Sequence, residues 1–391
     1  MNGKPVLVTI LAMAILAGCG PTPEDTSLPS TPRAAQEPCL ESGDQNTINA
    51  KLKGLGTAAI LCPGALFKLT APVVFSADRQ EIYTAGLPSD DTRATLRIVG
   101  PELTTAVIMR DYNAALLSNV IIDGNRANLG PRGGEALLYA GGYSDGQIIR
   151  GNKIMDPRSW SALQLIQGHS ESLPCKNALV EYNEIGPAGT SDELLWADGI
   201  SLTCTRTTVR ANVITDATDG GIVVFGAPGS LIEANTIRAE TRTLLGGINM
   251  VDYEPYDGNY AGTIVRNNII EASGAVIRIG LGMGQRVWVC LPPNSDEFTL
   301  SGGTVTGNIL RGEYMQYGFA VDGVRDWTVT DNVDGAKHTG NPSVACNGRL
   351  ASRPAGFLHN SARAEGAFQP EFEPGQLDLA LWAVVSPRPG E

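Results

Sequence analysis

The feature that most constrains this chain is an asparagine that returns at short intervals and is followed each time, within two residues, by isoleucine, valine or leucine. Successive copies lie 23 to 40 residues apart. The copies are Asn119-Val120-Ile121-Ile122, Asn152-Lys153-Ile154, Asn183-Glu184-Ile185, Asn212-Val213-Ile214, Asn235-Thr236-Ile237, Asn268-Ile269-Ile270, Asn308-Ile309-Leu310 and Asn332-Val333. Repetition with this period is typical of solenoids, whose units are too small to bury their own apolar faces and therefore stack. We expect a stack of similar coils.

The segments between these asparagines have the pattern of strands. Short apolar runs, such as Gly221-Ile222-Val223-Val224-Phe225 and Gly247-Ile248-Asn249-Met250-Val251, are bounded by Gly, Asn, Asp and Thr turns. Amphipathic helices do not interrupt the repeats, which argues against leucine-rich, ankyrin and tetratricopeptide solenoids. A parallel β-helix fits best. A β-sandwich or a propeller is the alternative, but propeller blades repeat more regularly and carry four strands each.

This repeat resembles that of the right-handed parallel β-helix proteins of the pectin-lyase-like superfamily, over roughly Cys39 to Asp334. The resemblance implies an all-β fold, a right-handed parallel β-helix solenoid. It also implies that each recurrent asparagine lies at a sharp turn between two strands, where it tolerates the left-handed conformation. The stacked asparagines of successive coils are then expected to hydrogen-bond to one another.

The solenoid is expected to occupy residues 38–345 as one domain. Apolar residues at helical spacing between Gln45 and Leu55 predict an N-terminal helix that caps the solenoid, since its open end exposes unpaired strand edges. Residues 346–391 lose the repeat but keep aromatic and aliphatic side chains. We expect this C-terminal tail to pack on the solenoid or to cap its other end.

The first 37 residues have the composition of a targeting segment and a tether. The apolar run from Val6 to Leu16 is too short to span a bilayer in the mature protein. Leu16-Ala17-Gly18-Cys19 resembles the lipobox of bacterial lipoproteins, which implies that residues 1–18 are a signal peptide and that Cys19 is acylated; an ordinary secretory signal is the alternative. Residues 19–37, rich in Pro, Ser and Thr, predict a flexible tether. We then expect the protein in the bacterial cell envelope, anchored to the lipid bilayer through Cys19 and facing the periplasm or the cell exterior.

Six further cysteines agree with export and suggest disulfides. They are Cys39, Cys62, Cys175, Cys204, Cys290 and Cys346. Sequence alone allows fifteen connectivities. Because a β-helix stacks coils that are adjacent in sequence, we expect sequential pairing, which gives Cys39–Cys62, Cys175–Cys204 and Cys290–Cys346.

The formal net charge of −12 constrains the partners. An acidic protein repels polyanions at long range, so nucleic acid is not expected as a partner and strongly anionic polysaccharides are disfavoured, although a local basic groove can override the net field. The sequence has no C-x-x-C motif and its three histidines are scattered. We therefore expect no metal site and no cofactor, with structural calcium in the turns left open.

Carboxylates gather where successive coils are expected to align. Ile200, Ile222 and Ile248 are expected to share one station. Asp198 and Asp219 then lie at one edge of adjacent coils, about 5 Å apart at strand spacing. The candidate catalytic carboxylates are Asp198, Asp219, Asp216, Asp252 and Glu254. Glycoside hydrolysis needs one protonated and one ionised carboxyl group, and crowding raises one pKa by like-charge repulsion; the alternative is structural, because Asp-Gly forms turns.

The segment Ala275-Val276-Ile277-Arg278-Ile279-Gly280 resembles the one that carries a catalytic Arg in β-helix polysaccharide lyases of the alginate and chondroitin type. The resemblance implies that Arg278 stabilises the enolate formed when a base removes the proton beside a uronate carboxyl group. Those enzymes also use a Lys in the preceding coil, and Asp257-Gly258-Asn259-Tyr260 offers none. The alternative is a salt bridge from Arg278 to a carboxylate of the previous coil.

Other side chains near the middle coils are candidates for contact with a sugar. They are Trp196, Asn249, Tyr253, Tyr256 and Arg286. Aromatic faces stack on the C–H faces of sugar rings, although packing under loops is the commoner role of a single ring. The leading hypothesis is an extracytoplasmic enzyme that cleaves a polysaccharide by carboxylate acid–base hydrolysis in a β-helix groove. One rival is a polysaccharide lyase that uses Arg278, which predicts a cationic patch around Arg266, Arg278 and Arg286. The other rival is a non-catalytic protein that binds glycan or contributes to the envelope surface.

Overall fold

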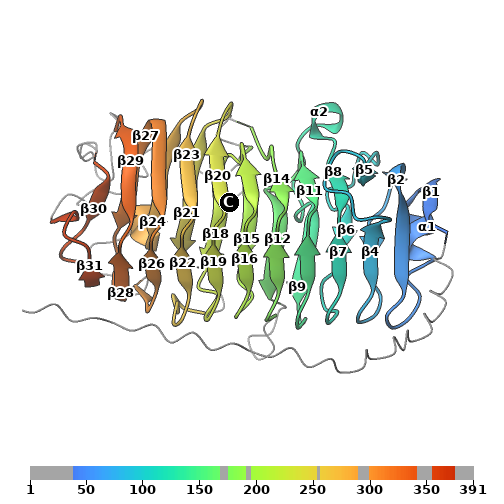
Figure 1. Cartoon of the computed structure of the whole chain (residues 1–391), viewed down its shortest axis with the longest axis horizontal. Helices are drawn as coiled ribbons and strands as arrows, with labels where there is room; N and C mark the ends of the chain where they lie inside the picture. The colour runs from blue at the N-terminus through green and yellow to red at the C-terminus, as the bar shows by residue number, and fades with distance from the viewer. Residues whose placement is uncertain are drawn as a thin grey trace, which may run out of the picture. The chain divides into compact units, whose positions relative to one another are not determined.

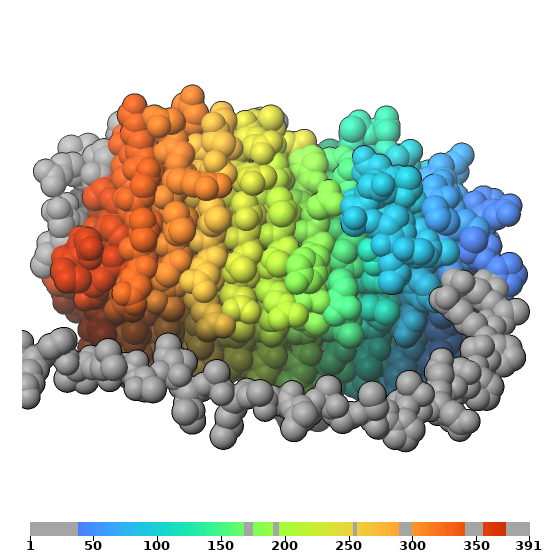
Figure 2. All heavy atoms as spheres, in the orientation of Figure 1, coloured from blue at the N-terminus to red at the C-terminus, as the bar shows by residue number. Residues whose placement is uncertain are grey.

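The computed structural model describes residues 38–167, 175–190, 195–252, 256–288, 299–340 and 355–374. The chain from Cys39 onward belongs to one compact unit. Its strands lie side by side in sequence order, and each pairs in parallel with the equivalent strands of the coils before and after it (Figure 1). Figure 2 shows the result on one face, where the colour changes in successive bands from coil to coil. The described part of the chain is a parallel β-helix, which confirms the predicted fold class.

Three rows of parallel strands run along the β-helix, and a typical coil contributes one strand to each row. The first row is β4 (Glu81–Thr84), β7 (Leu116–Ser118), β10 (Ile148–Arg150), β13 (Leu179–Glu181), β16 (Thr208–Arg210), β19 (Leu231–Glu233), β22 (Ile264–Arg266), β26 (Thr304–Thr306), β28 (Val324–Thr330) and β31 (Ala364–Phe368). The second row is β5 (Ala94–Ile98), β8 (Val120–Asp123), β11 (Lys153–Met155), β14 (Glu184–Ile185), β17 (Val213–Thr215), β20 (Thr236–Ala239), β23 (Ile269–Ala272), β27 (Ile309–Val321) and β29 (Val333–His338).

The third row carries the longest strands of the middle coils. It is β3 (Val73–Val74), β6 (Val107–Ile108), β9 (Leu138–Gly142), β12 (Ser161–Gln167), β15 (Asp198–Leu202), β18 (Gly220–Phe225), β21 (Leu244–Val251), β24 (Ile277–Met283), the second half of β27, β30 (Phe357–His359) and β32 (Glu373–Pro374). The remaining elements are β1 (Leu40–Gly43), β2 (Ala58–Leu69), which joins the first two rows, β25 (Leu300–Ser301), α1 (Gln45–Asn49), α2 (Arg126–Leu129) and the 3₁₀ turn η1 (Gln285–Val287).

A stack of aliphatic side chains fills the interior. In the first row the central residue of each strand points inward, and in the second row the residue two positions after each recurrent asparagine does so. These residues include Ile149, Val180, Val209, Ile232, Val265, Ile154, Ile185, Ile214, Ile237 and Ile270, and nearly all are fully buried. Each coil gains most of this burial from its neighbours, which is why the repeat in the sequence must be read as a stack.

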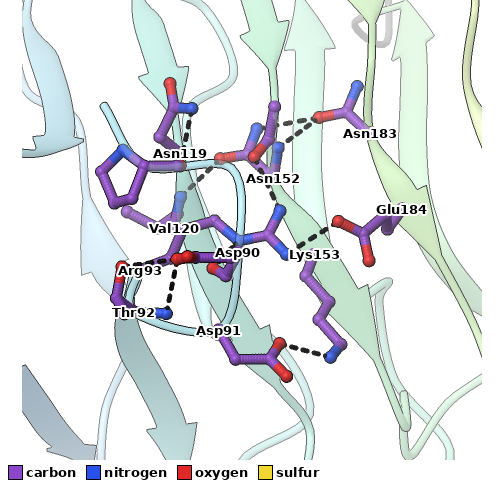
Figure 3. Close-up of polar contacts among 12 residues, drawn as sticks. Asp90, Asp91, Thr92, Arg93, Asn119, Val120, Asn152, Lys153, Asn183 and Glu184 are labelled. Atoms are coloured by element: carbon purple, nitrogen blue, oxygen red, sulfur yellow. Dashed lines mark hydrogen bonds and ion pairs between the residues drawn. The ribbon is translucent and has the colours of Figure 1, made fainter. Parts of the chain in front are cut away.

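An asparagine ladder runs through the interior between the first and second rows. Its members are Asn152, Asn183, Asn212, Asn235, Asn268, Asn308 and Asn332. From Asn183 onward, each Oδ1 accepts both the main-chain N–H and the side-chain Nδ2–H of the asparagine one coil earlier, at 2.9 to 3.1 Å. Figure 3 shows the first rungs, at Asn152 and Asn183. The expected hydrogen bonding between stacked asparagines is confirmed.

The left-handed conformation belongs to the residue before each ladder asparagine. Positive φ angles occur at Gly151, Tyr182, Ala211, Ala234, Asn267, Gly307 and Asp331. The expectation that the recurrent asparagine itself is left-handed is therefore wrong for the ladder. The reason is that its main-chain and side-chain N–H groups must both point at the next Oδ1, so the preceding residue makes the turn. Asn119 is offset by one: its own φ is 51°, and Val120 N–H donates to Asn152 Oδ1.

A loop ahead of β5 packs against the beginning of the ladder. Arg93, 2 % exposed, donates from Nε to the Asp90 carbonyl and from Nη1 to the Gly151 carbonyl, and its Nη2 lies 2.8 Å from Glu184 Oε1. Lys153 Nζ lies 2.8 Å from a carboxylate oxygen of the same loop (Figure 3). One buried guanidinium thus joins the loop to two successive coils.

The ends of the β-helix differ from the expected boundaries. The predicted N-terminal helix is present but short, as α1, and Asp44 caps it by accepting the N–H groups of Asn46 and Thr47. At the other end, β30 and β31 pair in parallel with β27 and β28, so the parallel pairing continues beyond residue 345. The loss of the asparagine motif hid this last coil, because Gln369 takes the place of an asparagine and its Oε1 accepts Asn332 N–H.

Two of the three expected disulfides form, Cys39–Cys62 and Cys175–Cys204. The third pair, Cys290–Cys346, lies outside the described residues. The same holds for the predicted signal peptide, Cys19 and the tether. Within the part of the chain that the structure describes, no helix is long and apolar enough to cross a membrane.

Candidate functional site

The outward face of the third row carries several buried polar side chains in the middle coils. Along β12, Leu163 and Leu165 belong to the interior core, so Gln164 between them points outward. Strand pairing continues this outward station from coil to coil. The residues at the station are Tyr139, Gln164, Ser201, Val223, Asn249, Gly282, Ala320 and Leu358.

Asp198 lies on this face inside a hydrogen-bond network. Its side chain is buried, with only 4 % of the residue exposed. Oδ2 accepts the hydroxyl of Ser201 at 2.8 Å, and Oδ1 accepts the main-chain N–H of Gly220 at 3.0 Å. The hydroxyl groups of Ser201 and Ser161 lie 3.0 Å apart. The carboxylate is therefore fixed in one orientation by two neighbouring coils.

Three polar atoms on the same face have no hydrogen-bond partner among the described residues. They are Gln164 Oε1, Asn249 Oδ1 and Trp288 Nε1, and each is buried. Gln164 and Asn249 are themselves only 3 % and 5 % exposed. A buried polar group without a partner costs about 1–3 kcal/mol and calls for an explanation. We refer to Ser161, Gln164, Asp198, Ser201, Asn249 and Trp288 together as the polar strip.

Glycines leave room for the polar strip. A Cβ atom on Gly220 would lie 3.0 Å from Asn249 Nδ2 and 3.3 Å from Asp198 Oδ1, so both side chains converge on this bare backbone. The indole of Trp288 packs in the same way against Gly246 and Gly282, with Nε1 2.9 Å from the Cβ position of Gly282. Larger residues at these glycines would displace the strip.

A second set of glycines explains why the sequence repeats Asp198-Gly199-Ile200, Gly220-Gly221-Ile222 and Gly246-Gly247-Ile248. A Cβ on Gly199 would lie 2.5 Å from the carbonyl oxygen of Gly221 and 2.8 Å from the Ile214 side chain. A Cβ on Gly221 would meet the next coil at 2.5 Å in the same way. These glycines permit the close approach of successive coils beside the strip.

A pocket of about 260 Å³ lies next to the strip, where the third row begins. We call it the corner pocket. It is lined by Arg126, Pro131, Arg132, Gly133, Arg158, Ser159, Trp160, Leu195 and Trp196. Trp160 directly precedes β12, and its carbonyl accepts the N–H of Asp198. The pocket and the strip are therefore contiguous along the same coils.

The structure confirms the alignment on which the carboxylate hypothesis depends. Ile200 pairs with Ile222 and Ile222 with Ile248. The residue that follows Asp198 along the stack is Gly220, however, and Asp219 lies one position earlier in its coil. Asp219 is half-buried, and its carbonyl accepts Gly246 N–H. The two carboxylates are on consecutive coils but at different stations.

Asp216 caps a turn of the next coil. Its Oδ1 accepts the N–H groups of Glu240, Thr241 and Arg242 at 2.8 to 3.2 Å, and its Oδ2 accepts the Thr241 hydroxyl at 2.6 Å. Burial raises the pKa of Asp216, but these hydrogen bonds outweigh burial and the pKa is lowered. This environment favours the structural alternative stated for the turn carboxylates.

The remaining candidates of the middle coils lie near the end of β21. Asp252 is half-buried and its Oδ1 accepts Gly258 N–H at 2.8 Å. Tyr256 is half-buried, and burial raises the pKa of its phenol to about 12. Tyr253 and Glu254 lie outside the described residues. Asp252 and Tyr256 follow the long strands, whereas Asp198 and the corner pocket lie at their beginning.

The arginines of the lyase hypothesis do not form one patch. Arg278 is half-buried in β24 and Arg286 is buried in η1, both beside the third row. Arg266 lies in β22, in the first row, where its Nη2 is 2.7 Å from Glu233 Oε2. The expected grouping of Arg266 with the other two arginines is wrong, because Arg266 belongs to a ladder of Arg–Glu pairs on a different face.

Asp198, Asn249 and Trp196 were already candidates from the sequence, but most of the residues around them were not. Ser161, Gln164 and Ser201 carry no motif, and only the strand register places them beside Asp198. Trp288 belongs to η1 and folds back over two glycines of the third row. Within the described ranges, no group of three or more His, Cys, Asp or Glu side chains is placed to hold a metal ion.

Comparisons with known proteins agree with this architecture. The sequence matches the right-handed β-helix region over residues 136–334, about half of the chain. An alginate lyase from a Paenibacillus species shares the fold at a TM-score of 0.55 and 13 % identity, over 76 % of this chain and 97 % of the lyase. A surface adhesin of Streptococcus pneumoniae aligns at a TM-score of 0.45 and 12 % identity, over 78 % of this chain and 89 % of the adhesin. A search of curated proteins finds no match. The chain belongs to the right-handed β-helix family.

Proposed function

We propose that this protein binds a glycan along the outward face of the third row, with the polar strip as the centre of the site. The observation that carries the proposal is the set of unpartnered buried atoms Gln164 Oε1, Asn249 Oδ1 and Trp288 Nε1 around a fixed carboxylate. Two of these atoms accept hydrogen bonds and one donates. A ligand that both donates and accepts would satisfy all three.

Sugar hydroxyl groups have this property. Each hydroxyl donates one hydrogen bond and accepts others, and the C–H face of a sugar ring packs against an indole such as Trp288. Asn249 and Trp288 lie directly over the backbone of Gly246, so the amide and the indole are held side by side. The alginate lyase that shares the fold acts, by its name, on a polysaccharide. We propose the same broad class of ligand here.

Hydrolysis of the bound glycan is a second candidate, favoured by one observation. Asp198 begins β15 and Asp219 directly precedes β18, so the two carboxylates lie on consecutive coils, one position out of register. The two environments differ, because Asp198 is held by Ser201 and Gly220 whereas Asp219 is more exposed. Acid–base hydrolysis requires one protonated and one ionised carboxyl group, and this pair is the candidate for those two roles. Eliminative cleavage that depends on Arg278 remains the rival chemistry.

The binding proposal is tested with the domain from Pro38 onward and a panel of neutral and acidic oligosaccharides, by isothermal titration. We expect Asn249→Ala to weaken binding about 3- to 10-fold, since one neutral hydrogen bond contributes about 0.5–1.5 kcal/mol. Asn128→Ala, an exposed asparagine of α2, is the control and should bind as the parent does. Absence of binding to every oligosaccharide, or equal affinity of the two variants, would contradict the proposal.

The hydrolysis candidate needs a separate readout. New reducing ends and the ultraviolet absorbance of unsaturated products are followed in the same mixtures. Reducing ends that disappear in Asp219→Asn, while binding persists, would support hydrolysis. Absorbance that depends on Arg278 would replace it with elimination. Binding without either signal would leave a glycan-binding protein.

We also propose that the protein is anchored in the bacterial envelope by lipid at Cys19, on the strength of the lipobox-like sequence Leu16-Ala17-Gly18-Cys19. A clickable fatty acid fed to expressing bacteria should label the full-length chain. The label should be absent from Cys19→Ser. Equal labelling of both chains would rule out acylation at this cysteine.

A further inference from the structure

We propose that the corner pocket holds one sugar ring that carries a carboxylate, packed on Trp160 and Trp196 with its carboxylate directed at Arg132. This inference rests on the proposed glycan site and names the chemistry of one of its subsites. It also modifies the expectation, drawn from the net charge of −12, that acidic glycans are disfavoured. The local field of the pocket is opposite to the field of the whole chain.

The lining of the pocket fits a single ring. Two indoles, Pro131 and Leu195 supply apolar surface, and three guanidinium groups supply positive charge. The volume of about 260 Å³ lies just below the range of about 300–1,000 Å³ that is typical of pockets for drug-sized ligands. Indole faces pack on the C–H face of a pyranose ring.

The positive charge of the pocket is only partly cancelled by carboxylates. Arg126 Nη1 and Nη2 donate to the carbonyls of Pro157 and Leu195, both at 3.0 Å. Arg158 donates to carbonyl oxygens of five residues, Gly100, Pro101, Leu103, Leu129 and Gly130. Carbonyl dipoles solvate a guanidinium without removing its net charge. Both side chains are buried, so water screens these charges less than it would at the surface.

Two acids act on this group: Glu102, which interacts with Arg132 and Arg158, and Asp156 of the neighbouring turn. Asp156 interacts electrostatically with Arg126 and Arg242. Burial raises the pKa of Asp156, and repulsion from Asp123 adds to the rise.

Arg132 is the guanidinium that can exchange partners. Its Nη2 pairs with Glu102, and both side chains are substantially exposed, at 42 % and 77 %. Exposed ion pairs contribute about 0–1 kcal/mol, so a ligand carboxylate that is also held by two indoles can replace Glu102. Arginine binds a carboxylate in bidentate geometry, which gives selectivity over a neutral sugar.

The position of the pocket connects it to the polar strip. Trp160 precedes Ser161, and Trp196 lies two residues before Asp198. A glycan with one acidic unit in the pocket would place its next units over Gln164, Asp198 and Asn249. The pocket therefore selects the acidic unit, and the strip binds hydroxyl groups of its neighbours.

The test compares a uronate-containing oligosaccharide with the same oligosaccharide after reduction of its carboxyl groups, by titration calorimetry and tryptophan fluorescence. We expect the acidic form to bind about 10-fold more tightly or better, and the difference to shrink as salt is raised. Arg132→Gln should remove the preference. Arg266→Gln is the matched control, since Arg266 has a similar exposure of 43 % and a similar ion pair, with Glu233, on another face.

Trp196→Ala should weaken both ligands, because the ring contact does not depend on charge. Equal affinity for the two oligosaccharides, or a preference that survives in Arg132→Gln, would overturn the inference. A sulfated analogue that binds 10-fold more tightly than the uronate would also overturn it. If only the corner pocket is wrongly assigned, both oligosaccharides still bind and Asn249→Ala still weakens them. If the glycan site itself is wrong, neither binds.

Discussion

Asn212→Ala removes a rung from the middle of the asparagine ladder. The Asn212 side chain accepts from Asn183 N–H at 3.0 Å and from Asn183 Nδ2 at 2.9 Å, and it donates to Asn235 Oδ1 at 2.9 Å and to the Val180 carbonyl at 3.0 Å. All three asparagines are essentially inaccessible to solvent. The substitution therefore acts on a buried network that water does not reach.

The magnitude follows from which groups lose their partners. After the substitution, Asn183 Nδ2 keeps the Ile149 carbonyl and Asn235 Oδ1 keeps Asn212 N–H. The main-chain N–H of Asn183 loses its acceptor. An orphaned buried donor costs about 1–3 kcal/mol, and the small void left by the amide adds to this, so we expect a loss of about 2–4 kcal/mol.

Urea unfolding of the domain from Pro38 onward measures this loss as a lower midpoint at unchanged slope. Asn128→Ala, at an exposed site, should change stability by less than about 0.5 kcal/mol. Asn212→Asp keeps the shape but replaces the donor by a second acceptor and buries a charge. It should be worse than alanine at pH 7 and recover as its carboxyl group is protonated. A loss for Asn212→Ala no greater than that of Asn128→Ala would refute the idea that the ladder stabilises the stack.

Three further outcomes are expected. Because the folded pKa of Asp216 is lowered, its ionised form stabilises the fold above the unfolded pKa of about 3.9, and this contribution is lost as pH falls through the folded value. Asp216→Asn should therefore be less stable than the parent at pH 7, and the urea midpoints of the two chains should converge as the pH is lowered. Cys175 and Cys204 are 29 residues apart, and replacing both by Ser should lower the free energy of unfolding by about 3–4 kcal/mol in the same assay. Reduction of the disulfide in the parent should reproduce most of this loss. Gly221→Ala should cost about 1–3 kcal/mol because its Cβ would meet the next coil at 2.5 Å, whereas Gly133→Ala, with open space around the Cβ, should be near neutral.

The fold was predictable because the coils of a solenoid share one recurring residue pattern. Each coil needs the same short aliphatic runs and the same inward asparagine, so the period is visible in one sequence. The partner of each coil is its neighbour in sequence, which also made the pairs Cys39–Cys62 and Cys175–Cys204 predictable. The last coil was missed because Gln369 replaces the asparagine there.

The site was predictable only in part. Asp198 and Asn249 stood out because they accompany the repeated Gly-Ile sequence, which fixes their station in the stack. Ser161, Gln164 and Ser201 have no sequence signal of their own, since an outward polar residue on a strand is ordinary. These side chains are buried and close together because other segments cover the outward face of the third row. The periodicity of the sequence does not show which segments cover that face.

The sequence by itself thus determined the stacking of coils, the register of the middle strands and two disulfides, because these follow from local repetition. Tertiary structure alone decided which polar groups are buried without a hydrogen-bond partner. It alone also brought three arginines and two tryptophans together in one pocket, namely Arg126, Arg132, Arg158, Trp160 and Trp196. Those arrangements bring together turns from different coils, whose lengths vary and whose residues follow no period. Physical proximity across coils, rather than any motif, creates the candidate site.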